Sequence, residues 1–411
     1  MPTSYITISS ETFKKYWSLI QAAIKGYKPI RNYESFVLLE TNTAQQTLAF
    51  RAANGQGGIY AIISGQDQPS SLTVHADMLV AIQTEELTRV LPFFHGVLDI
   101  TSVDEKPGEV RFVAGAVEQH LPWSSTIVED FPTQWQTMTE RACFTCPDFG
   151  RRLRLGSNSA SRDSKLANTF SASAFIQIGG SGISIESAGP TRGVSRMKWC
   201  PSDLVVSDDP FAHIIPIASI EVLARLASEA AQTPIVITND IGGGQIGWQF
   251  GGITYFTRTL GERFYSIEMM YGGVTEADCS VPIQPFTDII GLICAQTKAD
   301  VTAKATVAML EDGGVSITSP STHAMTVGRM PGLCGGTLPK NVTMNARQVV
   351  EILSDLKNKK GVVHLDVRSL ADKMGANRPT LRISSPDEPE YLHVAVLMSE
   401  AIERTPDVPG L

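Results

Sequence analysis

One pattern is written three times along this chain, at a spacing close to the size of a whole domain. Phenylalanine opens the first amphipathic stretch of each copy, at Phe13, Phe149 and Phe286, with separations of 136 and 137 residues. Periods of about 20–50 residues are typical of solenoids and propeller blades, whereas a unit of about 100–150 residues has room for its own core. The repeat therefore predicts three tandem domains of the same kind.

A second marker supports the same division. Each copy has a second amphipathic stretch that begins near an alanine, at Ala76, Ala218 and Ala346, with separations of 142 and 128 residues. We expect domains over residues 1–136, 137–273 and 274–398. Residues 399–411 contain two prolines and no strand pattern, so we expect a flexible C-terminal tail.

Each copy mixes helical and strand patterns in the same order. Phe13, Trp17, Ile20 and Ile24 follow one another at spacings of four, three and four, which predicts a helix that buries one stripe. The second helices are expected over residues 76–91, 218–230 and 346–356, and short alternating runs between the helices predict antiparallel strands. The fold class is therefore α+β, with two helices packed on antiparallel sheets in each copy.

Composition narrows the class of protein. The 411 residues are 43% hydrophobic and 18% charged, as in ordinary globular proteins, and no apolar run reaches the roughly 20 residues that cross a bilayer. The N-terminus does not have the pattern of a signal peptide, so we expect a cytoplasmic protein with no membrane partner. Six cysteines in so long a chain are expected to be reduced thiols.

Motifs for catalysis are weak. Residues 242–247 match the glycine pattern of dinucleotide sites, but a strand pattern follows where such a site needs a helix, so we predict a hairpin turn. Cys143 and Cys146 form a C-x-x-C pair, which leaves a thiol redox enzyme as one alternative, although two half-buried thiols are the more common meaning. We expect a protein that is not an enzyme and that uses no cofactor or metal.

The net charge of −8 leaves room for local basic faces. Lys14, Lys25 and Lys28 follow a stripe beside the buried one of the first helix, with Lys15 next to them. Residues 141–165 hold six basic and two acidic side chains, and residues 345–361 hold four and two. These runs fall on the repeated helices, which favours a binding face over a merely solvated one.

Several segments resemble the sliding clamp, the β subunit of bacterial DNA polymerase III. Residues 253–264 (ITYFTRTLGERF) are similar to the strand that ends the second clamp domain, and residues 129–132 (EDFP) end the first copy in a similar way. Residues 213–216 (HIIP) resemble the entry to a clamp helix, and residues 390–398 (EYLHVAVLM) resemble the last clamp strand. In element order the resemblance covers residues 5–398.

The resemblance implies three clamp-type domains in each chain and a ring closed by two chains. Such a homodimer encircles duplex DNA without reading its sequence and tethers a DNA polymerase as a processivity factor, and the polymerase and the clamp loader bind through short peptide motifs. Positive charge is then needed only on the helices that line the hole. The residues expected to contact DNA are Lys14, Lys15, Lys25, Lys28, Arg151, Arg152, Arg154, Arg347 and Lys357.

The resemblance also places a peptide groove between the second and third copies. The residues expected to form it are Arg192, Gly193, Val194, Tyr265, Met269, Met270, Val394, Val396, Leu397 and Met398. The sequence departs from the family pattern in this region, since residues 187–193 read SAGPTRG and the chain continues beyond residue 398. A divergent clamp-fold protein, from a phage, a plasmid or a second chromosomal copy, that serves as a repair or scaffold hub is therefore the main alternative.

Overall fold

The computed structural model describes residues 4–24, 29–66, 71–102, 108–132, 138–167, 169–207, 209–230, 232–240, 242–261, 264, 266–297, 302–310, 313–320, 325–331, 333–335, 342–371 and 377–396. The chain is α+β, with short helices and almost entirely antiparallel sheets. Among the helices within these ranges, none is long and apolar enough to cross a membrane.

Two compact units divide the described residues. The first comprises Met1–Pro147, Ser202–Asp209 and Arg225–Thr259, and the second comprises Asp148–Pro201, Pro210–Ala224 and Leu260–Leu411. The middle copy of the repeat contributes to both units, because its strands belong to two different sheets. The domain boundaries at residues 136, 273 and 398 remain a prediction from the repeat.

The first unit has one five-stranded and one nine-stranded sheet, in the orders β5-β1-β7-β8-β9 and β14-β10-β16-β17-β18-β4-β3-β2-β6. Its strands are β1 (Ser4–Ser9), β2 (Phe36–Asn42), β3 (Thr47–Asn54), β4 (Gly57–Ser64), β5 (Leu72–Val74), β6 (Met78–Gln83), β7 (Val97–Ser102), β8 (Glu109–Ala114), β9 (Val117–Pro122), β10 (Thr139–Phe144), β14 (Val205–Val206), β16 (Ile235–Asn239), β17 (Gln245–Phe250) and β18 (Ile253–Arg258). Its helices are α1 (Ser10–Ile24), α2 (Thr84–Val90) and α3 (Ser125–Asp130), with 3₁₀ turns η1 (Asn32–Ser35) and η2 (Leu91–Phe93).

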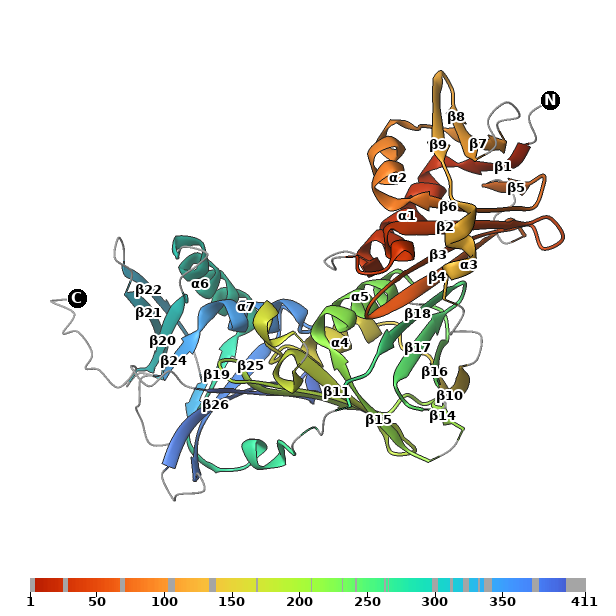
Figure 1. Cartoon of the computed structure of the whole chain (residues 1–411). Helices are drawn as coiled ribbons and strands as arrows, with labels where there is room; N and C mark the ends of the chain where they lie inside the picture. The colour runs from red at the N-terminus through yellow and green to blue at the C-terminus, as the bar shows by residue number, and fades with distance from the viewer. Residues whose placement is uncertain are drawn as a thin grey trace. The chain divides into compact units, whose positions relative to one another are not determined.

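The second unit has one nine-stranded and one four-stranded sheet, in the orders β15-β11-β12-β13-β27-β26-β25-β19-β23 and β22-β21-β20-β24. Its strands are β11 (Ser173–Gly179), β12 (Gly182–Gly189), β13 (Gly193–Trp199), β15 (Phe211–Pro216), β19 (Val274–Pro282), β20 (Lys304–Met309), β21 (Val315–Pro320), β22 (Met325–Met330), β23 (Leu333–Gly335), β24 (Val342–Asn345), β25 (Val362–Ala371), β26 (Asn377–Ser385) and β27 (Glu388–Val396). Its helices are α4 (Phe149–Gly156), most of α5 (Ile217–Glu229), α6 (Ile283–Gln296) and α7 (Ala346–Asp355), with 3₁₀ turns η4 (Ser164–Leu166), η5 (Phe170–Ala172) and η6 (Glu268–Tyr271). Helices α6 and α7 lie side by side (Figure 1).

The three marker phenylalanines are equivalent in the structure. Phe13, Phe149 and Phe286 lie in α1, α4 and α6, and each side chain is fully buried. In the first copy the ring of Phe13 packs edge-on against Phe50 of β3, with ring centroids 5.0 Å apart. Buried aromatic pairs of this kind hold a helix on its sheet. The repeat therefore marks a fully buried phenylalanine in the first turns of a helix in each copy.

One predicted helix is wrong in its first half. Residues Met78–Gln83 form strand β6, which pairs with β2, and α2 begins only at Thr84. The run is apolar enough to suit either element, and pairing with β2 decides it. Strands β15 and β24 likewise precede α5 and α7, so the second helices begin at Thr84, Ile217 and Ala346, with separations of 133 and 129 residues. The predicted helices near 218–230 and 346–356 are confirmed as α5 and α7.

The glycine-rich stretch belongs to a hairpin, as predicted: residues 242–244 form the turn and residues 245–247 begin strand β17. Strand β17 pairs with β16 and β18 on its two sides. Because a strand, and not a helix, comes next, the turn lacks the helix N-terminus that would hold a pyrophosphate group.

Both nine-stranded sheets run across the border between copies. In the first unit β18 of the second copy pairs with β4 of the first, and in the second unit β13 pairs with β27 of the third. Gly58 allows the first of these junctions, since a Cβ atom there would lie 2.5 Å from a ring carbon of Phe256. Main-chain hydrogen bonds thus join neighbouring copies within each unit.

Candidate partner-binding surface and basic faces

An apolar cluster covers part of one face of the large sheet in the second unit. Its buried members are Val194, Ile267, Tyr271, Leu392 and Val394, and Ala188, Phe264 and Met270 pack against them while remaining partly exposed. The register of β13 and β27 brings the cluster together, because Val194 lies directly opposite Val394. We call this set of eight residues the apolar cluster.

The two faces of the sheet have different roles because side chains alternate along a strand. On β27, Leu392 and Val394 belong to the apolar cluster, whereas His393 between them contacts Gln348 of α7. The apolar cluster therefore lies on the face opposite to α7.

The segment that contains η6 covers this face and is held by Arg196. The Arg196 guanidinium donates to the Glu268 carboxylate at 2.8 Å and lies 4.3 Å from the centre of the Tyr271 ring. Cation–π contacts of this length are favourable when partly desolvated. Burial raises the pKa of the Tyr271 hydroxyl, and burial also raises the pKa of Glu186, which lies opposite Arg196 in the β12–β13 pair. Met269 in the middle of the segment is 69% exposed.

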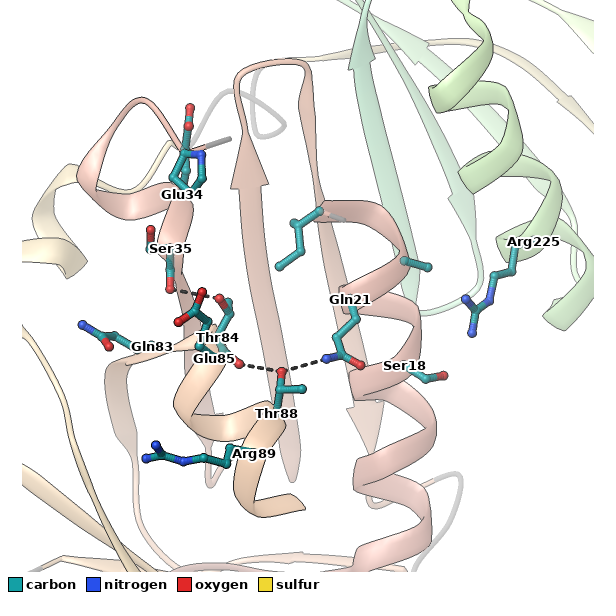
Figure 2. Close-up of a pocket in the computed structure, with 13 residues that line it drawn as sticks. Ser18, Gln21, Glu34, Ser35, Gln83, Thr84, Glu85, Thr88, Arg89 and Arg225 are labelled. Atoms are coloured by element: carbon teal, nitrogen blue, oxygen red, sulfur yellow. Dashed lines mark hydrogen bonds between the residues drawn. The ribbon is translucent and has the colours of Figure 1, made fainter. Parts of the chain in front are cut away.

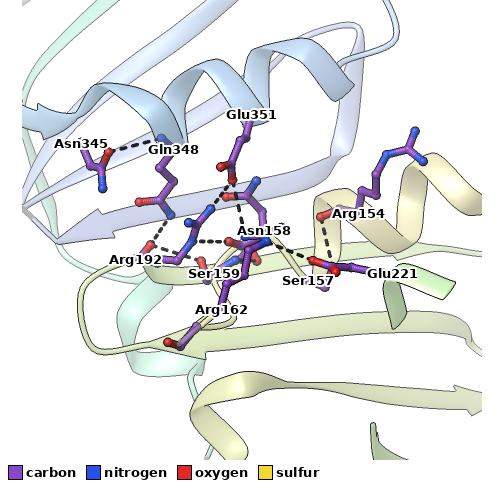
Figure 3. Close-up of polar contacts among 12 residues, drawn as sticks. Arg154, Ser157, Asn158, Ser159, Arg162, Arg192, Glu221, Asn345, Gln348 and Glu351 are labelled. Carbon is purple, nitrogen blue, oxygen red and sulfur yellow. Dashed lines mark hydrogen bonds and ion pairs between the residues drawn. The ribbon is translucent and has the colours of Figure 1, made fainter. Parts of the chain in front are cut away.

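The other face of the same strand pair carries a polar network centred on Arg192 (Figure 3). Arg192 forms an ion pair with Glu351 of α7, and its Nε donates to the Asn158 carbonyl oxygen at 2.8 Å. The Gln348 amide nitrogen donates to the Arg192 carbonyl oxygen at 2.6 Å. Arg162 extends the network, since it pairs with Glu221 at 3.1 Å and with Glu351 at 3.5 Å. Charged groups thus bridge elements of the second and third copies.

His393 is buried inside this network. Its ring nitrogens lie 3.3 Å from the Gln348 amide nitrogen and 3.4 Å from the Ser159 hydroxyl. Burial, followed by the charge of Arg192, lowers the pKa of His393 to about 3. The imidazole is therefore neutral at physiological pH.

Six of the ten residues predicted for the groove can be placed in the structure, on one face or the other of the β13–β27 strand pair or at its edge. Val194, Val394 and Met270 belong to the apolar cluster, Met269 borders it, and Arg192 faces α7. Gly193 has φ of +76°, and a Cβ atom there would lie 2.0 Å from the Val394 carbonyl oxygen, so only glycine fits.

The remaining predicted positions add little detail. Val396 is the last residue of β27, and Tyr265, Leu397 and Met398 lie outside the described residues, as does the tail at 399–411. Sequence reasoning missed the other five members of the apolar cluster, Ala188, Phe264, Ile267, Tyr271 and Leu392. The alternation of apolar and polar residues along β27 was a usable signal for Leu392, which is two residues from Val394.

The arginines of α4 are largely occupied by carboxylates. Arg151 forms ion pairs with Asp148 and Glu388, and its side chain is 16% exposed. Arg152 donates to Asp148 at 3.0 Å, stacks over Trp199 at 5.1 Å and is 14% exposed. Arg154 pairs with Asp355 at 2.9 Å and is 46% exposed. A phosphate can therefore reach Arg154 far more easily than Arg151 or Arg152.

The other predicted DNA contacts are spread over both units. Lys15 and Lys357 are exposed, whereas Lys14 donates to the Phe94 carbonyl oxygen at 2.5 Å and Arg347 donates to the Thr297 carbonyl oxygen at 3.0 Å. Lys25 and Lys28 lie outside the described residues. Exposed lysines are the side chains best suited to contacts with phosphate that do not depend on sequence.

A polar pocket lies between α1 and α2 in the first unit (Figure 2). It has a volume of about 870 Å³, and Gln21 donates across it to the Thr88 hydroxyl at 2.7 Å. Its charged lining residues are Glu34, Glu85, Arg89 and Arg225, two of each sign. This part of the helical surface is thus polar without being basic.

Cys143 does not have the properties of a reactive thiol. Burial, then the nearby carboxylates of Glu140 and Asp203, raises its pKa. A redox-active cysteine needs the opposite shift, because the thiolate is the nucleophile. Cys146 is buried. These properties count against the thiol redox alternative.

Comparison with known proteins gives a likeness in fold. No family profile and no curated protein matches the sequence. Solved structures, in contrast, are similar in fold. One of them is a sliding clamp from Bacillus subtilis (12% identity, TM-score 0.77, covering 96% of this chain and 99% of that one). A DNA polymerase III beta subunit from Pseudomonas aeruginosa bound to griselimycin (14%, 0.76, 96% and 99%) and a putative beta subunit from Eubacterium rectale (12%, 0.75, 96% and 100%) are equally similar. The chain therefore has the sliding-clamp fold over nearly its whole length, at low sequence identity.

Proposed function

We propose that this protein is a DNA sliding clamp: two chains close into a ring around duplex DNA and tether a DNA polymerase. The observation that supports this most strongly is the likeness in fold to clamps over 96% of this chain and 99–100% of theirs. Binding of DNA is then topological, and a few exposed cations suffice for sliding. Lys15, Arg154 and Lys357 are the best candidates for phosphate contacts, because their side chains are accessible.

Partner binding in this proposal uses the exposed edge of the apolar cluster. Val194 and Val394 are almost fully buried, so a peptide would contact mainly Met269, Met270 and Phe264. Methionine side chains adapt to different apolar anchors, which suits a surface that serves a polymerase and a clamp loader in turn.

Retention on circular DNA tests the ring. We expect protein loaded on circular duplex by the loader of its own cell to stay bound at a salt concentration that weakens simple phosphate contacts. Cutting the circle once should release it, because the ring slides off the ends. Blocking both ends with bulky protein adducts is the matched control and should restore retention. Equal loss from circles and from cut DNA would rule out encirclement.

The second candidate is a clamp-fold protein that serves repair or a scaffold. The observation that favours it is that Arg192, which was predicted for the groove, instead faces α7, where it pairs with Glu351 and its carbonyl oxygen accepts from Gln348. Co-purification with the replicative polymerase of the cell separates the two candidates: a replicative clamp binds it, whereas a specialised one does not.

A further inference from the structure

Two cysteines stand directly opposite each other at one edge of the large sheet in the second unit. Strand β23 is the outermost strand of this sheet, and it pairs with β19 so that Cys334 is the direct partner of Cys279. The C-x-x-C pair at Cys143 and Cys146 stands out in the sequence, whereas the strand register brings together this different pair. Pairing between β19 and β23, which leaves no local signal in the sequence, creates the juxtaposition.

Directly opposite positions of an antiparallel pair have nearly the separation that a disulfide needs. Their Cα atoms are about 4.5–5.5 Å apart, and Cα atoms joined through a disulfide are about 4.4–6.8 Å apart. A bond between the two sulfur atoms therefore needs at most a small shift of the short strand β23. Only six cysteines occur in 411 residues, so two of them at directly opposite positions are not expected by chance.

Cys279 lies on the buried side of the large sheet. It is 1% exposed, and Leu365, its partner on the neighbouring strand β25, is buried to the same degree. Side chains alternate along a strand, and the next residue, Ser280, instead contacts His364, with the Ser280 hydroxyl 2.6 Å from the His364 Nδ1. A buried thiol packs as a small apolar group, and a disulfide is apolar as well, so this environment suits the oxidised pair also.

A cross-link at this position would change the behaviour of β23. The strand has three residues and pairs, among the described strands, with β19 alone. A short edge strand opens more easily than strands inside a sheet, and such opening lets a small oxidant reach buried sulfur atoms. In the chain β23 lies between β22 and β24 of the four-stranded sheet, so its attachment to β19 ties their connection to the large sheet.

We propose that Cys279 and Cys334 form a disulfide when the protein meets a peroxide, and that this bond holds β23 on the large sheet. Hydrogen peroxide oxidises one thiol to a sulfenic acid and is itself reduced to water. The sulfur of the second thiol then attacks the sulfenic sulfur, and the hydroxyl group leaves with the thiol proton as a second water. The covalent loop closed in this way contains α6, β20, β21 and β22. This inference does not depend on the proposed function.

Peptide mapping of the full-length protein tests the bond. The protein is treated with hydrogen peroxide, its remaining thiols are alkylated, and it is digested without reductant. We expect the peptides that contain Cys279 and Cys334 to be recovered joined, with the loss of two hydrogen atoms, and to separate in dithiothreitol. Cys334→Ser should abolish the joined peptides, whereas Cys200→Ser, which removes an exposed cysteine of the same unit, should leave their yield unchanged.

Thermal unfolding tests the effect on the strand. Peroxide treatment should raise the unfolding midpoint of the wild type relative to treated Cys334→Ser by at least about 4 °C, because a cross-link restricts the unfolded chain. The comparison between treated proteins cancels the effect of methionine oxidation.

The two measurements have separate contrary outcomes. Recovery of Cys279 and Cys334 from treated wild type as unlinked thiols, as sulfinic or sulfonic acids, or joined to other cysteines would overturn the disulfide, and this result holds even if Cys334→Ser folds poorly. Joined peptides without a difference in the unfolding midpoint would overturn the hold on β23.

Discussion

At the scale of single residues, His393 couples the stability of the second unit to pH. Its pKa is about 3 in the folded chain, against about 6.5 for an exposed histidine. Between these values the unfolded chain binds a proton that the folded chain does not. The free energy of unfolding should therefore fall as the pH decreases from about 6.5, by up to about 1.4 kcal/mol per pH unit.

Urea unfolding at pH 7 and pH 5 measures this effect. His393→Gln should reduce the loss of stability between the two pH values, whatever its cost at pH 7, because the titrating group is gone. His75→Gln, which removes a histidine at an exposed position, is the matched control. An identical pH dependence in wild type and His393→Gln would mean that His393 takes up its proton over the same pH range in the folded chain as in the unfolded chain.

Single residues also show what could and could not be predicted from the sequence. The basic run at 151–154 pointed to DNA, but the partners of Arg151 and Arg154 are Glu388 and Asp355, more than 200 positions away. A sequence pattern reveals charges within one helix and nothing of the carboxylates that folding brings to it. Gly193 shows that the sequence can also succeed. The position requires glycine because the Val394 carbonyl oxygen lies so close to it, and the resemblance had already placed Gly193 and Val394 in the same groove.

At the scale of elements, the strands and helices were largely predictable because their periodicities are local. The helices at 218–230 and 346–356 were found, whereas the start of α2 was misplaced because β6 depends on its pairing with β2. The joining of β18 to β4 and of β13 to β27 was not predicted, since strand pairing between copies leaves no local signal.

The η6 segment can be tested as part of the proposed partner-binding surface. If partners bind at the exposed edge of the apolar cluster, Met269→Glu should weaken binding of a labelled peptide that ends in Leu-Phe by about tenfold, because a buried charge would replace an apolar contact. Thermal stability should not change, since Met269 is 69% exposed. Leu292→Glu on α6, where the leucine is 51% exposed, is the matched control. Equal binding by all three proteins would remove the η6 segment from the proposed site.

At the scale of the whole molecule, the repeat predicts the number of chains. If two chains close into the proposed ring, the three like domains expected in each chain make half of a sixfold arrangement, and head-to-tail contacts at both ends close it. Light scattering should then give twice the chain mass of 44.4 kDa at micromolar concentration. A particle with the mass of one chain at that concentration would contradict closure by two chains.

The two sheets that cross copy borders limit how such a chain can change over evolutionary time. Separating the first copy from the second would expose the main-chain donors and acceptors of β4 and β18 along their length, and bare strand edges invite aggregation. The same holds for β13 and β27. A recombination event that exchanges one copy for a foreign one would therefore have to supply a strand that matches its neighbour.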